Sequence, residues 1–265
     1  MGGNPAGIAL IGTGFIGRAV VRRARVEGGG VQAVAHPHVP RCRRDDPERD
    51  AARWIQGNTR AYSDCVKTLR GHDRAINSAG AAAPASSDFE ALYAANVVWP
   101  AVLSRACADA GVRRLVHVSS AAVQGRRDPL DESADCRPLS PYAQSKADGE
   151  SALARMAASG LGAPETVLYR PTSVQGAGRG ITEALGRLAR LPRIPVNGDG
   201  SQQLPLALED NVAAAALFLA QVSSAPPPVA LHPWEGLTTA DLVAIFAPGA
   251  RILHLPPGMV MGCLA

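Results

Sequence analysis

The sequence predicts an α/β fold, a doubly wound parallel sheet with a small C-terminal lobe. Short apolar runs recur along the first two thirds of the chain, and each has the length of a buried strand. Longer segments with helical periodicity separate these runs, as crossover helices do in a parallel sheet. A glycine-rich turn follows the first apolar run directly. We expect strands at 8–11, 31–35, 74–77, 115–119 and 166–169, and helices at 14–27, 89–110, 141–159 and about 210–221.

Glycine and proline mark the ends of these elements. Residues 28–30, all glycine, end the first helix and permit the turn back into the second strand. Beyond about residue 174, glycines and prolines punctuate a loop-rich stretch that precedes the last helix. We therefore expect a sheet domain over residues 1–175 and a small, partly interleaved lobe over residues 176–265.

Composition narrows the class of protein. The chain has 265 residues, 46% of them hydrophobic, which is enough for a large domain with its own core. Its formal net charge of +4 comes from basic and acidic residues spread along the chain. Nucleic-acid binding would need a basic stripe interleaved with aromatic side chains, whereas aromatic residues make up only 4% of the chain. We therefore expect no nucleic-acid partner.

The cysteines and the N-terminal residues bear on location. The five cysteines are an odd number at wide spacing, with no C-x-x-C pair and no nearby histidine cluster. This pattern is typical of free cytosolic thiols, and we expect no metal site. The first residues contain only a short apolar run that Gly12 ends, which gives neither a secretory signal nor a membrane span. The expectation is a cytoplasmic protein without a membrane partner.

The glycine-rich turn is the first candidate for chemistry. Gly12, Gly14 and Gly17 form a G-x-G-x-x-G pattern between the first strand and the first helix, the context that dinucleotide binding requires. A diphosphate there would lie at the helix N-terminus, where N–H groups and the helix dipole favour negative charge. The alternative is a glycine-rich turn without a ligand, and the flanking strand and helix favour the cofactor.

The end of the second strand bears on which dinucleotide binds. A carboxylate there usually accepts hydrogen bonds from the adenosine ribose of NAD. This chain has His36 and His38 instead, with Arg41 and two further arginines soon after. These cations would tolerate or bind a 2′-phosphate, so the sequence favours NADP over NAD. A solvated loop and a solvated charged run explain the same residues equally well.

A tyrosine and a lysine form the candidate catalytic pair. Tyr142 and Lys146 are four residues apart in a predicted helix and therefore share one helix face. A nearby cation favours the phenolate and lowers the pKa of a tyrosine, which makes Tyr142 a credible general acid and base. Ser119 and Ser120 end a strand at the edge where ligands bind in such sheets, and one hydroxyl there could donate to a substrate oxygen. Serines that only cap the next turn are the alternative.

In this order along the chain, the motifs resemble the extended short-chain dehydrogenase/reductase family, and in particular its nucleotide-sugar epimerase/dehydratase branch. The resemblance covers about two thirds of the chain, and the order of its motifs is more specific than any one of them. The matching stretches are 12–17, 77–80, Asn96, 118–125, 142–146 and 169–172.

The resemblance implies an NAD(P)-binding Rossmann domain, a substrate-binding lobe and roles for individual residues. Ser120 would contact the reacting oxygen, Tyr142 would transfer the proton, and Lys146 would hold the nicotinamide ribose and tune Tyr142. The residues expected to bind substrate are Ser120, Ala121, Gln124, Arg179 and Gln202. Those expected to bind the cofactor are Gly12, Gly14, Phe15, Ile16, Gly17, His36, Arg41, Asn58, Asn77, Ala79, Gly80, Asn96, Ser119, Tyr142, Lys146, Pro171 and Val174.

Departures from the family pattern narrow the reaction. Dehydratases of this branch carry an Asp-Glu pair directly after the active-site hydroxyl, where this chain has alanines at 121 and 122, so dehydration lacks its acid and base. Gln124 stands where many relatives have an aromatic residue, and Asn58 where many have an Asp near the adenine. The stretch 197–204 resembles the family's sugar-nucleotide loop but lacks an arginine, so a diphosphate would need another cation such as Arg179.

We expect NAD(P)-dependent hydride transfer at a carbinol or keto carbon of a nucleotide sugar or a related small molecule, of the epimerase or ketoreductase type. A ketoreductase acting on a non-sugar metabolite and a non-catalytic NAD(P)-binding regulator stay open as alternatives. The resemblance also implies a homodimer in which the helices 89–110 and 141–159 of two copies pack together. The alternative is that both helices only cover the sheet.

Overall fold

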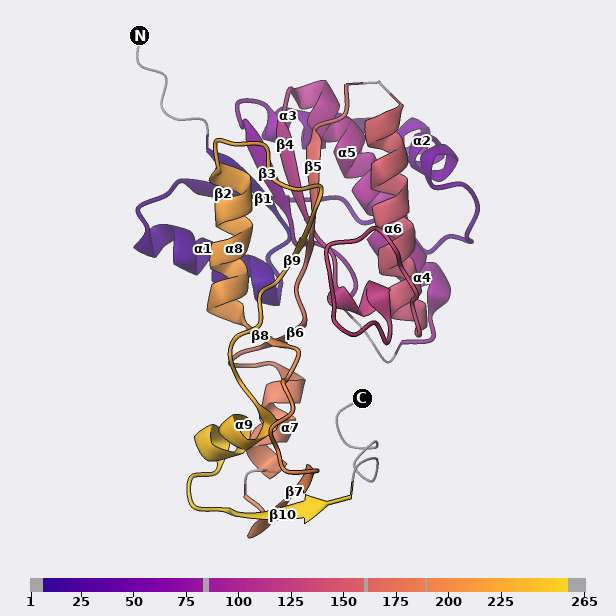
Figure 1. The fold of residues 1–265 in the computed structure, drawn as a ribbon. Helices are drawn as coiled ribbons and strands as arrows, with labels where there is room; N and C mark the ends of the chain where they lie inside the picture. The colour runs from indigo at the N-terminus through magenta and orange to yellow at the C-terminus, as the bar shows by residue number, and fades with distance from the viewer. Residues whose placement is uncertain (1–6, 83–85, 160–161, 189, 257–265) are drawn as a thin grey trace. The chain divides into compact units, whose positions relative to one another are not determined.

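Parallel strands form the centre of the structure, a computed structural model that describes residues 7–82, 86–159, 162–188 and 190–256 (Figure 1). Within these residues the largest sheet has six strands in the order β2-β1-β3-β4-β5-β9, and all neighbours are parallel. The predicted fold class is confirmed. The strands are β1 (Ile8–Ile11), β2 (Val31–Val34), β3 (Arg74–Asn77), β4 (Arg114–Val118), β5 (Glu165–Arg170) and β9 (Val229–Leu231).

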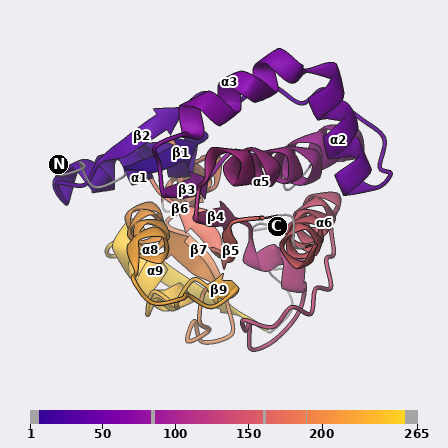
Figure 2. The same cartoon turned by 90° about the horizontal axis from the view of Figure 1, so that it is seen from above.

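Helices cover both faces of this sheet (Figures 1 and 2). Helices α1 and α8 lie on one face, and α2 to α6 lie on the other. The second group encloses a core that includes Tyr93, Leu103 and Leu153. The helices are α1 (Phe15–Val26), α2 (Pro47–Gly57), α3 (Thr59–Leu69), α4 (Phe89–Tyr93), α5 (Trp99–Ala110), α6 (Pro141–Ala158) and α8 (Glu209–Gln221), with one π-helical turn, η1 (Ala94–Val98), between α4 and α5.

The helix pair α2 and α3 is a feature that the sequence analysis did not expect. Asp46 caps α2 by accepting a hydrogen bond from the backbone N–H of Arg49, and Pro47 occupies the first helical turn. Trp54 and Leu69 join the core. The common doubly wound order has one more strand beyond the second, whereas here β2 is the edge strand within the described residues.

The chain divides into two units, each described by itself. The first unit holds the described residues up to Pro171 and the segment from Val212 to His232; the other described residues form the second. The segment 212–232 belongs with the sheet because β9 pairs with β5.

The described residues of the second unit form two short parallel strand pairs and two helices. Ile194, Val196 and Ala247 form its small buried core. No helix in the described ranges of either unit is long and apolar enough to cross a bilayer. The elements of the second unit are β6 (Ser173–Gln175) paired with β8 (Leu206–Leu208), β7 (Arg193–Asn197) paired with β10 (Arg251–Leu255), α7 (Gly180–Leu188) and α9 (Thr239–Phe246).

Candidate cofactor and catalytic site

A cleft of about 530 Å³ opens in the first unit where β1, β2 and β3 end. The carboxyl ends of parallel strands are where ligands bind in open α/β sheets. Helix α4 and the turn η1 close the cleft from the side. The lining residues are Gly12, Thr13, Gly14, His36, Pro37, His38, Val39, Arg41, Ser78, Ala79, Gly80, Ala81, Ala91, Ala95 and Trp99.

The three glycines of the turn after β1 have separate reasons to be glycine. Gly12 has φ +92°, and a Cβ there would collide with the backbone N of Ala79. A Cβ on Gly17 would collide with the carbonyl O of Gly12. Around Gly14, in contrast, no atom lies within 4 Å of such a Cβ. The packing of the protein requires Gly12 and Gly17, whereas Gly14 keeps open a space that a ligand can enter.

The start of α1 fits an anion beside that open space. Gly14 is the N-cap of α1, no side chain caps the helix, and its first turn carries no acidic residue. Backbone N–H groups and the helix dipole at such a terminus favour a phosphate. Phe15 and Ile16 are the first residues of α1 and are not among the residues that line the cleft. The cleft therefore fits a dinucleotide whose diphosphate lies at Gly14.

Two buried amides hold the loop after β3 against the cleft. The Oδ1 of Asn77 accepts the backbone N–H of Ala79 at 3.2 Å. Asn96, within the turn η1, accepts the N–H of Ala81 at 2.9 Å and donates to its carbonyl at 3.1 Å. Asn96 also donates to the Ser145 hydroxyl on α6 at 3.0 Å. This one side chain therefore joins the wall of the cleft to the helix that carries Tyr142 and Lys146.

Lys146 lies directly behind the cleft. Its side chain is buried, and its Nζ donates to the carbonyl of Val118 at the end of β4, at 3.1 Å. A Cβ added to Gly80, which lines the cleft, would lie 3.3 Å from this Nζ. Burial lowers the pKa of Lys146 to about 8, and the negative charge of Glu150, which raises this pKa, limits the decrease. A buried cation with a perturbed pKa beside a cleft is typical of a functional site.

Ser120 and Tyr142 are placed near the same end of β4 by their neighbours. Ser120 follows β4 by two residues, and its Oγ accepts the N–H of Ala122 at 3.2 Å. Tyr142 lies one turn before Lys146 on α6, on the same helix face. Neither residue lines the 530 Å³ cleft. Lys146 connects them to it, because its Nζ lies beside Gly80, which does line the cleft. The hydroxyl of Ser119 is buried and has no partner among the described residues.

A fully buried histidine lies beneath Lys146. The Nδ1 of His117 accepts a hydrogen bond from the Nδ2 of Asn77 at 3.0 Å. Burial, followed by the charge of Lys146, holds the pKa of His117 well below its usual value. His117 is therefore neutral, and Lys146 carries the positive charge at this point in the core.

An ion pair in the middle of α6 fixes the position of the helix that carries Tyr142 and Lys146. Glu150, one turn after Lys146, bonds Arg170 through both carboxylate oxygens at 2.5 and 3.0 Å. Both side chains are almost fully buried. Arg170 also donates to the carbonyl of Ser133, in the loop before α6. This bidentate pair ties α6, β5 and that loop together.

Four residues expected at the site have other partners or positions. Arg41 lines the cleft but forms an ion pair with Asp88 at 3.0 Å. Asn58 lies at the junction of α2 and α3, where its side chain donates to a backbone carbonyl of α2. It is not among the residues that line the cleft, because residues 47–57 form a helix and not a strand beside β2. The side chain of Gln124 is fully buried and bonds Asp131 at both ends. Pro171 accepts the N–H of Ala121 at 2.9 Å, which holds the turn after Ser120.

Three further candidates, Val174, Arg179 and Gln202, belong to the second unit. Val174 is buried in β6, and the Nε of Arg179 donates to its carbonyl at 3.3 Å. The backbone carbonyl of Gln202 accepts the backbone N–H of Thr239 at 3.1 Å. Their expected contacts with cofactor or substrate stay predictions.

Trp99 is the largest lining residue that sequence reasoning did not select. It stands four residues after Ala95 and eight after Ala91, and all three line the cleft. Residues three or four apart share a helix face, and Trp99 comes three residues after Asn96, so the expected role of Asn96 at the cofactor was a signal for Trp99.

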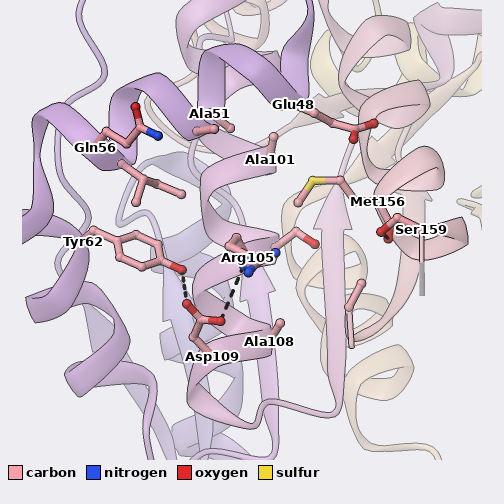
Figure 3. Close-up of a pocket in the computed structure, with 14 residues that line it drawn as sticks. Glu48, Ala51, Gln56, Tyr62, Ala101, Arg105, Ala108, Asp109, Met156 and Ser159 are labelled. Carbon is pink, nitrogen blue, oxygen red and sulfur yellow. Dashed lines mark hydrogen bonds and ion pairs between the residues drawn. The ribbon is translucent and has the colours of Figure 1, made fainter. Parts of the chain in front are cut away.

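A second pocket, of about 430 Å³, lies between α2, α5 and α6 (Figure 3). Its residues near the ends of α5 and α6 place it toward the amino ends of the strands, away from Ser120 and Lys146. Figure 3 shows Tyr62 directed at Asp109, to which it donates at 2.6 Å. Burial and this hydrogen bond raise the pKa of Tyr62, so the phenol stays protonated and is unsuited to act as a base. The catalytic candidates therefore belong to the other edge of the sheet.

Comparison with known proteins identifies a family. The model of the NAD dependent epimerase/dehydratase family matches residues 10–230. A UDP-glucose 4-epimerase of Streptomyces lividans is 33% identical over 181 residues, which cover 64% of this chain and 52% of the relative, so the chain matches about half of that relative's length.

Solved structures show the same fold. MoeE5 in complex with UDP-glucuronic acid and NAD has a TM-score of 0.69 and 26% identity, over 95% of this chain and 86% of that one. TunA, an NAD-dependent NDP-hexosamine 5,6-dehydratase, has a TM-score of 0.65 and 22% identity, over 95% of this chain and 84% of that one, which shows likeness of fold alone.

Proposed function

Since the chain belongs to the NAD dependent epimerase/dehydratase family, we propose that it binds a nicotinamide dinucleotide and catalyses hydride transfer at a carbinol or keto carbon of a nucleotide sugar. The observation that carries the proposal is the position of Lys146, buried behind Gly80 and bonded to the end of β4, one helical turn from Tyr142. The named relatives, a UDP-glucose 4-epimerase and a protein solved with UDP-glucuronic acid and NAD, support this substrate class.

In the proposed mechanism Tyr142 exchanges a proton with the hydroxyl or keto oxygen of the substrate. Lys146 favours the phenolate of Tyr142 by its charge, and Ser120 donates a hydrogen bond to the same oxygen as negative charge develops. The nicotinamide, when bound, supplies the donor or acceptor of the hydride. Gly14 and the start of α1 hold the diphosphate, and residues 77–80 line the dinucleotide.

Reaction type is proposed as epimerisation or keto reduction, and not dehydration. Residues 121 and 122, directly after Ser120, are both alanine and offer neither acid nor base for the loss of water. The exact outcome depends on whether the cofactor stays bound between half-reactions. Mass spectrometry of ligand released from freshly purified, denatured protein tests this: retained NAD supports the epimerase, and an empty site supports a reductase with exchangeable cofactor.

A reductase that uses NADPH is the second candidate, and one observation favours it. No carboxylate lines the cleft beside His36 and His38, so the usual acceptor for the ribose hydroxyls of NAD is absent from the described lining. We propose that Arg41, whose side chain is 64% exposed in its pair with Asp88, can turn to a 2′-phosphate. Affinities for NADP and NAD measured with Arg41→Gln test this: the variant should lose affinity for NADP alone.

We propose a homodimer in which two copies pack mainly through α6, and less through α5. Helix α2 packs against α5 and α6, so Ala51 and Ala101 already face one pocket within a single chain (Figure 3). A second copy would therefore pack mainly on α6 and beside α2. Light scattering of the purified protein tests the proposal, since a mass of one chain at all concentrations removes it.

A further inference from the structure

Resting on the proposed dinucleotide function, we propose that Trp99 and His36 form a stacking shelf for the adenine base. The two rings lie against each other in the cleft, with centroids 5.1 Å apart and planes tilted by 34°. Trp99 begins α5 and His36 follows β2, so residues far apart in the chain build this one wall.

The order of the strands decides which end of the dinucleotide reaches this wall. The diphosphate is expected at Gly14, after the central strand β1. On one side of β1 lie β3 and β4, which lead to Gly80 and Lys146, the catalytic end. On the other side lies β2, which leads to His36. The adenosine half must therefore extend over the end of β2.

Trp99 has the burial and the neighbours of a fixed platform. It is 2% exposed, so its ring is held in place by the surrounding core. Its indole N–H has no hydrogen-bond acceptor among the described residues, so no such bond explains a tryptophan at this position. Ala91 and Ala95 precede it on the same face and line the same cleft.

Stacking suits this cleft better than hydrogen bonding to a carboxylate. Among the described lining residues there is no Asp or Glu to accept from the ribose. A purine presents a flat π-face, and the stacking of a base on an aromatic side chain needs no particular donor or acceptor. His36 is exposed at the rim and Trp99 is buried behind it, so the base would lie on the ring of His36, which Trp99 supports from behind.

Calorimetric titration with fragments of the cofactor tests the shelf without turnover. The probes are ADP-ribose, which carries the adenine, and nicotinamide mononucleotide, which does not. We expect Trp99→Leu and His36→Ala each to weaken ADP-ribose binding roughly tenfold. Trp99→Phe and His36→Phe, which keep a flat ring, should lose much less, and nicotinamide mononucleotide should bind all four variants like the wild type.

Trp234→Leu provides the matched control, because Trp234 lies in the second unit with half of its surface exposed. It should bind ADP-ribose like the wild type. Thermal unfolding shows whether Trp99→Leu keeps its fold, and His36→Ala, at an exposed residue, carries the test if it does not.

The outcomes separate the shelf from the function on which it rests. If the wild type binds ADP-ribose and both His36→Ala and a folded Trp99→Leu bind it equally well, the shelf is wrong and the dinucleotide site stands. Equal losses of ADP-ribose and nicotinamide mononucleotide would also overturn the shelf, since they indicate general damage to the cleft. If the wild type binds neither NAD, NADP nor ADP-ribose, the proposed function itself fails.

Discussion

Lys146 should release its proton about two to three pH units below an ordinary lysine. Burial lowers its pKa from the ordinary 10.5 to about 8, and Glu150 limits the change. The difference of about 2.5 pH units corresponds to about 3 kcal/mol at 1.36 kcal/mol per unit. Keeping this ammonium group charged therefore lowers the free energy of unfolding of the protein by about 3 kcal/mol.

The sign of the pH dependence follows from the lowered pKa. Below about pH 8 Lys146 is charged in both folded and unfolded states, so the full cost is present. Between about pH 8 and 10.5 the folded protein loses the proton while the unfolded chain keeps it, so the cost is relieved. The free energy of unfolding should rise through this window relative to Lys146→Met, which has no such group.

The assay uses the fact that the chain has only two lysines, Lys67 and Lys146. With ¹³C at the ε-carbon, nuclear magnetic resonance should show two lysine signals. One should titrate near pH 8 and vanish in Lys146→Met. The other, from Lys67, should remain in that variant and so identifies the Lys146 signal by difference. A Lys146 signal that titrates at the ordinary lysine value of 10.5 would refute the account of Lys146 as a buried cation.

Three further predictions follow from named contacts. Glu150→Gln should lower the free energy of unfolding by about 3–5 kcal/mol, because Arg170 is left buried without its charged partner. The double variant Glu150→Leu with Arg170→Met should recover most of this loss. Urea denaturation that shows a loss below about 1 kcal/mol for Glu150→Gln would contradict a stabilising role of the ion pair. Gly12→Ala should unfold at a lower temperature than the wild type, whereas Gly14→Ala should unfold at the wild-type temperature and bind ADP-ribose more weakly. Calorimetry that finds the larger loss of thermal stability in Gly14→Ala would be evidence against these roles of the glycines. Turnover should fall above about pH 8 as Lys146 loses its charge, and a flat profile to about pH 10 would be inconsistent with that role.

Much of the sheet was predictable because its strands are continuous apolar runs. The predicted strands from 8–11 to 166–169 and the helices 14–27, 141–159 and 210–221 agree with the observed elements to within one residue at each end. The helix 89–110 is also present, with the turn η1 inside it. Such segments carry their periodicity in the sequence itself.

Helices α2 and α3 were missed because their start lies in a charged run. Asp46 and Pro47 are an N-cap and a first-turn proline, which together signal the start of a helix. They follow a cluster of arginines that was interpreted either as a contact for a 2′-phosphate or as a solvated charged run, and neither interpretation includes a helix. The strand β9 was missed for another reason. It has three residues after a run of prolines, and only its pairing with β5 defines it.

The candidate site was predictable in its motifs and not in its packing. The G-x-G-x-x-G pattern identified three glycines, and the structure shows which backbone atoms a Cβ at Gly12 or Gly17 would meet and that the space beside Gly14 is open. Gln124 was expected at the substrate, and the structure shows its amide buried and bonded to Asp131, which the sequence did not indicate. A tryptophan in a helix is far more often core than ligand wall, so Trp99 gave no signal alone.

In the proposed reaction, Tyr142 transfers a proton while the nicotinamide transfers a hydride. The direct measurement follows deuterium from reduced nicotinamide labelled at C4 into the carbinol carbon of a keto sugar nucleotide, for the wild type and for Tyr142→Phe. We predict transfer by the wild type and a loss of at least roughly a hundredfold in rate for the variant, with unchanged affinity for ADP-ribose. A Tyr142→Phe variant that transfers deuterium at the wild-type rate would contradict the claim.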